Sequence, residues 1–153
     1  IQYEQDYFRE KLESSGKFFS KGDMYIYDNK FQCVKYDNGL ITTINKLNKQ
    51  IIHDVVNEED ITIFDILIGK DDNLEIHDPI FEKNSIRIPF NVKEWDIKGS
   101  ISTNYANGSP KSITFKQGQD LKVVIKINPV EFDGNFTPPI YDTSNFEVIN
   151  LIE

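Results

Sequence analysis

Histidine and cysteine, the side chains that most often carry catalysis near neutral pH, are scarce in this sequence. The two histidines, His53 and His77, are each followed by an aspartate, and a His–Asp pair can orient a general base. Successive side chains of a strand point to opposite faces, so two neighbours in a regular strand cannot meet. No recognisable nucleophile motif accompanies either histidine. We therefore predict no catalytic residues and no enzymatic activity.

The segment from Asp71 to Asp78 concentrates carboxylates and an amide, whose oxygen atoms are the ligands that Ca²⁺ prefers. A calcium-binding helix–loop–helix motif requires glycine at the sixth loop position, which is Ile76 here. An acidic turn that is simply solvated accounts for the same residues. We therefore predict neither a metal site nor a cofactor.

Cys33 is the single cysteine, so no intramolecular disulfide can form. The cysteine content therefore does not indicate the cellular compartment. It lies in a mainly apolar run, Phe31–Val34, without a neighbouring cation or histidine. This setting predicts a buried structural thiol rather than a reactive one.

Charge supplies the first candidate binding surface. The chain has a net charge of −8, and residues 51–100 hold twelve acidic and five basic side chains. Such an acidic face would steer a protein partner with a basic surface. Free nucleic acid is excluded because clustered cations are missing, and no apolar run is long enough for membrane insertion. The candidate binding residues are Asp54, Glu58, Glu59, Asp60, Asp71, Asp72 and Glu75.

Aromatic residues supply a second candidate surface. Exposed rings on one sheet face could stack against sugars, so a carbohydrate is the alternative ligand. The other interpretation of the same alternation is a half-buried sheet face. The candidate platform residues are Tyr25, Tyr27, Tyr36 and Trp95, with Tyr105 as a further ring.

The elements that must position these residues are predicted to be strands. Isoleucine is abundant and alanine occurs once, a composition that favours strands over helices. The exception is residues 1–16, where Tyr3, Tyr7, Phe8 and Leu12 share one helical face and Gly16 follows. We predict a single domain over residues 1–153. It has an N-terminal helix over 1–16, a strand core over 17–128, and an extended tail over 129–153 with a possible last strand.

Turn signals between the short alternating segments set the fold class. Asn38-Gly39 is a strong hairpin signal, and another hairpin is predicted around Gly118. Strands at this spacing predict an all-β, antiparallel β-sandwich, with a β-barrel of the oligonucleotide-binding type as the alternative. The predicted function is non-enzymatic protein–protein interaction or assembly, as a structural subunit, a surface or phage module or an immunity-type binder. The alternative is a carbohydrate-binding module of a larger secreted protein.

Overall fold

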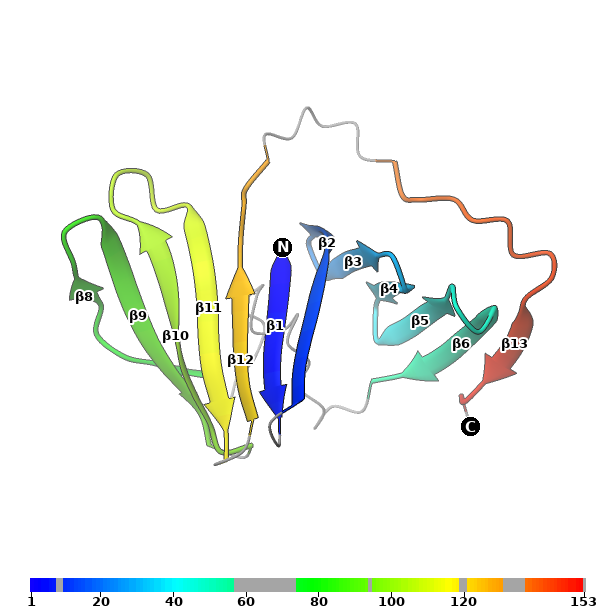
Figure 1. Cartoon of the computed structure of the whole chain (residues 1–153), viewed down its shortest axis with the longest axis horizontal. Helices are drawn as coiled ribbons and strands as arrows, with labels where there is room; N and C mark the ends of the chain where they lie inside the picture. Colours follow the sequence, from blue (N-terminus) through cyan, green and yellow to red (C-terminus); the bar gives the residue numbers. More distant parts are fainter. Residues whose placement is uncertain (8–9, 57–73, 94, 119–120, 131–136, 153) are drawn as a thin grey trace. The chain divides into compact units, whose positions relative to one another are not determined.

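The protein consists of β-strands wherever its structure is described (Figure 1). The structure is a computed structural model, and it describes residues 1–7, 10–56, 74–93, 95–118, 121–130 and 137–152. These ranges contain no helix that could span a membrane. The prediction of an all-β fold is confirmed. The strands are β1 (Gln2–Tyr7), β2 (Glu10–Lys21), β3 (Met24–Asn29), β4 (Gln32–Asp37), β5 (Leu40–Asn45), β6 (Gln50–Val55), β7 (Leu74–Ile76), β8 (Ile80–Phe81), β9 (Ser85–Val92), β10 (Ile97–Asn104), β11 (Pro110–Gln117), β12 (Leu121–Lys126) and β13 (Glu147–Asn150).

The described strands form one open sheet, so neither the predicted sandwich nor the barrel is confirmed. The hydrogen-bonded order is β13-β6-β5-β4-β3-β2-β1-β12-β11-β10-β9-β7, and β8 pairs with β9 beside this path. Most neighbours in the order are consecutive in sequence because short turns join antiparallel strands. The exceptions are β13 beside β6, β1 beside β12, and β7 beside β9.

The prediction of an N-terminal helix over residues 1–16 is wrong. The described residues of this segment lie in β1 and the first part of β2. Strand β1 pairs antiparallel with β12, and Tyr3 and Tyr7 lie opposite Ile125 and Leu121. A helical period and a strand period both accommodate Tyr3 and Tyr7. The long-range partner, which the local pattern does not show, decides in favour of the strand.

Gly16 does not end a helix but permits a close approach inside β2. A Cβ atom at this position would lie 2.5 Å from the Asp28 carbonyl oxygen and 2.6 Å from the Tyr27 ring. Only glycine leaves room for that ring against the neighbouring strand.

The chain divides into two compact units, each assembled from two separate sequence segments. Unit 1 comprises Ile1–Ser14 and Asp65–Glu131, and unit 2 comprises Ser15–Phe64 and Phe132–Glu153.

Unit 1 contains an antiparallel sheet with one apolar and one polar face. The register places Phe90, Gly99, Phe115 and Val123 side by side across β9, β10, β11 and β12. The three apolar side chains of this row are buried. Alternation along each strand therefore assigns the odd positions of β10, β11 and β12 to the core. The even positions of these strands form the polar face.

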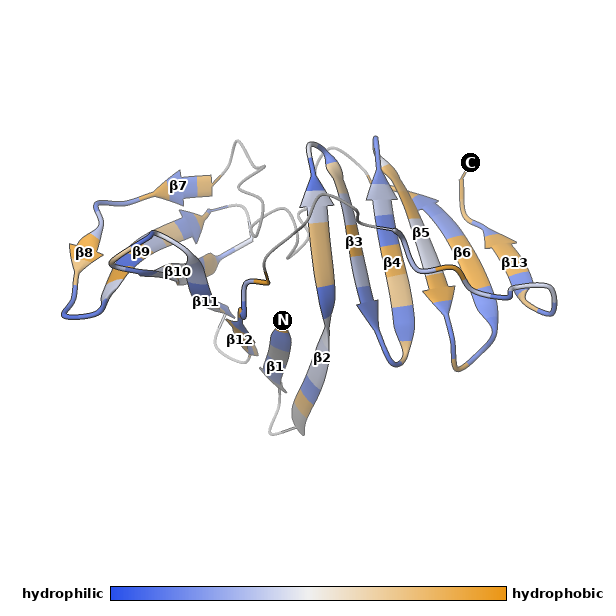
Figure 2. Cartoon of the chain, turned by 90° about the horizontal axis from the view of Figure 1, so that it is seen from above, coloured by the Kyte–Doolittle hydropathy of each residue, from blue (hydrophilic) through white to orange (hydrophobic). Residues whose placement is uncertain are grey.

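Unit 2 contains the hairpin that its turn signal predicts. Asn38 and Gly39 have φ values of 51° and 84°, which suit the tight turn between β4 and β5. The strands β3 to β6 carry alternating hydrophilic and hydrophobic bands (Figure 2). Strand β13 lies within the predicted C-terminal tail and pairs in parallel with β6, with Val148 opposite Ile51.

Candidate functional site

The acidic side chains predicted to form one binding face lie only partly within the described residues. Asp54 is half-buried in β6, and its carboxylate accepts a 2.8 Å hydrogen bond from the Val55 backbone N–H. Glu75 in β7 accepts a 2.5 Å hydrogen bond from Lys93 Nζ. The two carboxylates belong to different units, so the acidic face stays a prediction. The other candidates lie outside the described residues: Glu58, Glu59, Asp60, Asp71 and Asp72.

The three tyrosines considered as a platform lie in the core of unit 2. Tyr25 is 0% exposed, and its ring stacks on that of Tyr36 with 5.0 Å between centroids and 10° between planes. Tyr27 is also buried, and its hydroxyl accepts a 3.3 Å hydrogen bond from Asn29 Nδ2. These rings cannot meet an external ligand, so the structure places them on a buried sheet face. Trp95 is half-buried in the turn between β9 and β10.

Each histidine contacts a neutral polar side chain. His53 Nδ1 lies 3.1 Å from Thr42 Oγ1 on the adjacent strand, whereas the register places Asp54 on the opposite face. His77 Nε2 lies 2.7 Å from Asn91 Nδ2. Among the residues that the structure describes, no three His, Cys, Asp or Glu side chains are arranged to hold a metal ion.

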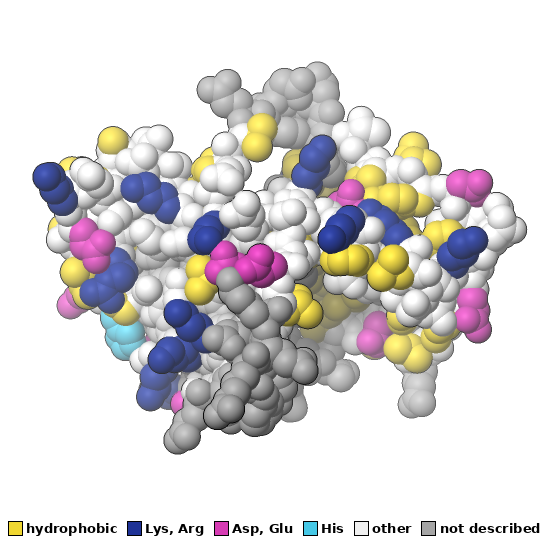
Figure 3. Space-filling model, in the orientation of Figure 1, with side chains coloured by type: hydrophobic (Ala, Val, Ile, Leu, Met, Phe, Trp, Pro, Cys, Tyr) yellow, Lys and Arg dark blue, Asp and Glu magenta, His cyan; other side chains and the backbone are white. Residues whose placement is uncertain are grey.

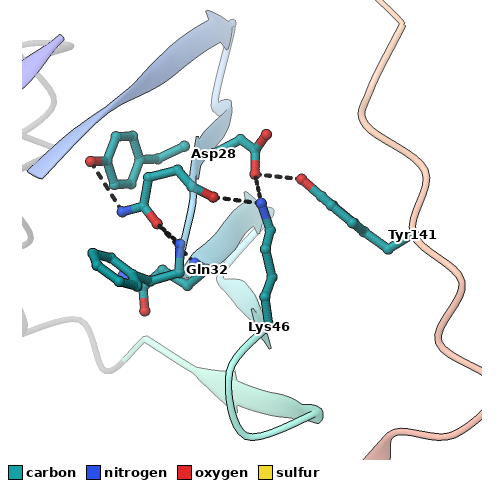
Figure 4. A network of polar contacts seen from close by, with 7 residues as sticks. Asp28, Gln32, Lys46 and Tyr141 are labelled. Atoms are coloured by element: carbon teal, nitrogen blue, oxygen red, sulfur yellow. Dashed lines mark hydrogen bonds and ion pairs between the residues drawn. The ribbon is translucent and has the colours of Figure 1, made fainter.

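A charged cluster joins three segments of unit 2 (Figure 4). Lys46, in the turn after β5, donates hydrogen bonds to Asp28 Oδ1 at 2.6 Å and to the Asn29 carbonyl oxygen at 2.5 Å. The Tyr141 hydroxyl donates to the same Asp28 oxygen, and the Tyr141 ring centroid lies 4.5 Å from Lys46 Nζ. We call Asp28, Lys46 and Tyr141 the Asp–Lys–Tyr cluster.

Local turn chemistry places Asp28 in this cluster. The side-chain oxygen of Asn29 accepts hydrogen bonds from the backbone N–H groups of Phe31 and Gln32, both at 2.8 Å. Such a side-chain-to-backbone turn reverses the chain directly after β3. The Phe31 carbonyl oxygen then accepts a 2.8 Å hydrogen bond from the Lys46 backbone N–H, which brings the two turns together.

The pKa shifts of Lys46 and Tyr141 suit a structural role for the cluster rather than a catalytic one. Burial, followed by the hydrogen bond to Asp28, raises the pKa of Tyr141 to about 12. Burial by itself would lower the pKa of Lys46, but hydrogen bonds to Asp28 and Tyr141 outweigh it and raise that pKa. Burial and the Asp28 charge raise the pKa of the Cys33 thiol. At neutral pH the phenol and the thiol are therefore uncharged, and neither is activated as a base or a nucleophile.

Unit 1 exposes apolar side chains at one margin of its sheet. Phe81 is 67% exposed and Tyr105 is 57% exposed, and their rings meet edge to face with centroids 6.4 Å apart. Ile76 and Ile80 are exposed in the adjoining strands β7 and β8. The register sets Phe81 opposite Ile86 of β9, on the face of the sheet that also holds Phe90. Ile76 lies opposite Phe90 and shares this face, whereas Ile80 lies opposite Arg87 on the other face. We call Ile76, Phe81 and Tyr105 the aromatic edge.

Sequence reasoning identified Tyr105 as a candidate ring but missed the other two members of the aromatic edge, Ile76 and Phe81. Phe81 and Tyr105 are far apart in the chain, and only the pairing of β8, β9 and β10 brings them together. The Asp–Lys–Tyr cluster was missed for the same reason, because 113 positions separate Asp28 from Tyr141. Neither group of residues forms a recognisable local motif in the sequence.

Comparison with protein-family models and with curated protein sequences found no match for this chain. Function is therefore inferred from the geometry of the aromatic edge and of the charged groups.

Proposed function

We propose that this domain binds another protein without performing catalysis, and that the aromatic edge is the contact. The observation that carries the proposal is the pair of exposed rings, Phe81 and Tyr105, with exposed Ile76 on the same face of the sheet. Aromatic side chains dominate protein interfaces because each buries a large apolar area when a partner covers it. Single exposed apolar residues are ordinary, whereas two exposed rings in contact at a sheet margin are typical of an interaction site.

The partner that fits this margin is an extended protein segment that adds a strand beside β7 or β8. Among the described strands, β7 and β8 each pair with β9 alone, so a partner strand added beside them would extend the sheet. Asp78 is exposed between these two strands and favours a basic residue in the partner. The acidic residues from Asp54 to Glu82 have the same charge preference, and steering by them is part of the proposal.

Substitution of the two rings tests this proposal. Phe81→Ser and Tyr105→Ser should each reduce capture of the partner from the native source by about tenfold or more, as expected for interface hot spots. Leu47→Ser is the matched control, since Leu47 is an equally exposed apolar residue in unit 2. Quantitative mass spectrometry of the captured proteins measures the effect, and urea unfolding verifies that each variant is folded. Equal recovery of the same proteins by all variants would refute the aromatic edge as the contact.

The alternative, binding of a neutral carbohydrate on an aromatic platform, has less support. Tyr25, Tyr27 and Tyr36 are buried, and the rings of Phe81 and Tyr105 lie 78° apart instead of in one plane. Binding to a neutral glycan array that survives Phe81→Ser would restore it. The two-sheet sandwich expected from the strand spacing is likewise a proposal, which a crystal structure tests.

A further inference from the structure

The polar face of unit 1 aligns lysines across three neighbouring strands. The register pairs Lys98 of β10 with Lys116 of β11, and Lys116 with Lys122 of β12. All three side chains are exposed, and adjacent strands lie about 4.8 Å apart. Figure 3 shows several Lys and Arg side chains on the face of unit 1 that it draws. We call Lys98, Lys116 and Lys122 the lysine row.

The lysine row places like charges directly opposite each other on paired strands, which destabilises a sheet. The register continues the row to Asp6 of β1, opposite Lys122, and to Asn91 of β9, opposite Lys98. No ion pair involves the lysine row within the described part of the chain. The ion pairs of unit 1 there are Glu4–Lys126, Glu75–Lys93 and Glu82–Arg87.

Hydroxyl groups occupy the next positions along the same face. Ser100 lies opposite Thr114, and Ser102 lies opposite Ser112. These four residues are half-buried, and they occupy even positions of β10 and β11, on the same face as the exposed Lys98 and Lys116. A hydroxyl group both donates and accepts hydrogen bonds. A ligand on this face would thus meet ammonium groups along one line and hydroxyl groups of β10 and β11 along the next two, which continue to Val124 and Lys126 of β12.

The chemistry of the face distinguishes among polyanions. On the even positions of β10, β11 and β12 the structure places no aromatic side chain, since the rings of β9 and β11 lie on the apolar face. Single-stranded nucleic acid is held largely by stacking on aromatic rings. Double-stranded nucleic acid requires a broad basic surface, whereas the lysine row is a single line of three cations.

We propose that the lysine row and the adjoining hydroxyl groups bind a linear acidic polysaccharide. A polymer with a carboxylate or sulfate on successive sugar rings presents anions in a line, as the lysine row presents cations across β10, β11 and β12. Its free hydroxyl groups can hydrogen-bond with Ser100, Thr114, Ser102 and Ser112. The site lies on the opposite sheet face from the apolar core, so it is independent of the aromatic edge.

Binding to two acidic polysaccharides tests the proposal directly. Immobilised heparin supplies sulfates and polygalacturonate supplies carboxylates, while dextran is the neutral control. The wild-type protein should bind at least one acidic polymer at low ionic strength, with an affinity that falls as salt is added. A Lys98→Gln, Lys116→Gln, Lys122→Gln triple variant should bind about tenfold or more weakly, because the released counterions are fewer.

The control variant removes the same number of charges from unit 2. Lys17→Gln, Lys21→Gln, Lys49→Gln changes three exposed lysines there and should bind like the wild type. Phe81→Ser should also bind like the wild type, which separates this site from the proposed protein contact. The proposal is overturned by equal affinities of the two triple variants, or by failure of the wild type to bind either acidic polymer. Tighter binding of duplex DNA than of both polymers would also overturn it.

Discussion

A methyl group added at Gly99 should destabilise unit 1 by a predictable amount. The new Cβ atom would lie 2.6 Å from Phe90 Cζ, 2.6 Å from the Thr114 carbonyl oxygen and 2.7 Å from Phe115 Cβ. Carbon atoms in favourable contact lie about 3.5–4.0 Å apart, so each neighbour would have to move by about 1 Å. The carbonyl belongs to the strand ladder and both rings are buried, so none of the three can yield easily.

The expected loss combines two opposing effects on the free energy of unfolding. Overpacking of a core costs about 1–3 kcal/mol, while alanine restricts the unfolded chain and returns about 0.4–1 kcal/mol. We expect Gly99→Ala to lower the free energy of unfolding by about 1.5 kcal/mol. With a typical slope of about 2 kcal/mol per molar urea, the midpoint should fall by about 0.7 M.

The single tryptophan makes the measurement specific to unit 1. Trp95 lies in the turn that leads into β10, so its fluorescence during urea unfolding reports on this sheet. Ser100→Ala on the opposite face of β10 is the matched control and should change the unfolding free energy by less than about 0.5 kcal/mol. A midpoint for Gly99→Ala equal to or above that of the wild type would show that the ring contacts over this glycine are absent in solution.

Three further predictions concern the Asp–Lys–Tyr cluster and its surroundings. Tyr141→Phe should lower the free energy of unfolding by about 1 kcal/mol at neutral pH through loss of one hydrogen bond. Because the folded pKa of about 12 lies above the ordinary value of 10.0, this cluster's contribution should persist below pH 10 and decline as the pH rises toward 12. Ultraviolet titration should accordingly find one tyrosine fewer ionising at the highest pH in Tyr141→Phe, and an unchanged curve would contradict the assignment. Lys46→Met should destabilise by about 1–3 kcal/mol because it leaves the half-buried Asp28 carboxylate without its cation. Lys35→Met, which breaks an exposed ion pair, should cost less than about 1 kcal/mol, and equal urea midpoints would argue against the cluster. The Cys33 thiol should react with a disulfide reagent at pH 8 much more slowly in the folded protein than in urea, since burial raises its pKa and hinders access; equal rates would exclude the buried position.

The predictable part of the fold is the part that local chemistry determines. Asn38-Gly39 marks a turn because both residues adopt positive φ, and the alternation around it fixes the strands β4 and β5. The N-terminal segment was mistaken for a helix because its aromatic spacing suits two periods. Only the distant partner β12 selects the strand there, and Gly16 serves a ring contact that local sequence does not reveal.

The candidate sites also divide into features that the local sequence predicts and features that depend on the pairing of distant strands. Burial of Cys33 follows from its apolar neighbours, and the opposite orientation of His53 and Asp54 follows from strand alternation. The lysine row depends on which strands are neighbours and in what register, so three lysines separated in sequence gave no signal of a shared surface. The net charge of the chain indicated an acidic surface instead, because an acidic total conceals a local basic patch.

Because each unit combines two separate segments of the chain, the two units are completed at different stages of translation. The last described strand of unit 1, β12, is synthesised before β13, and the sheet of unit 2 gains Tyr141 and β13 only after residues 141–150 have been translated. Until then β6 lacks its pairing with β13, and Asp28 and Lys46 lack their contacts with Tyr141. A nascent chain stalled before residue 137 would therefore present an incomplete sheet edge to other unfinished chains. Chaperone engagement should accordingly be greatest at that stage.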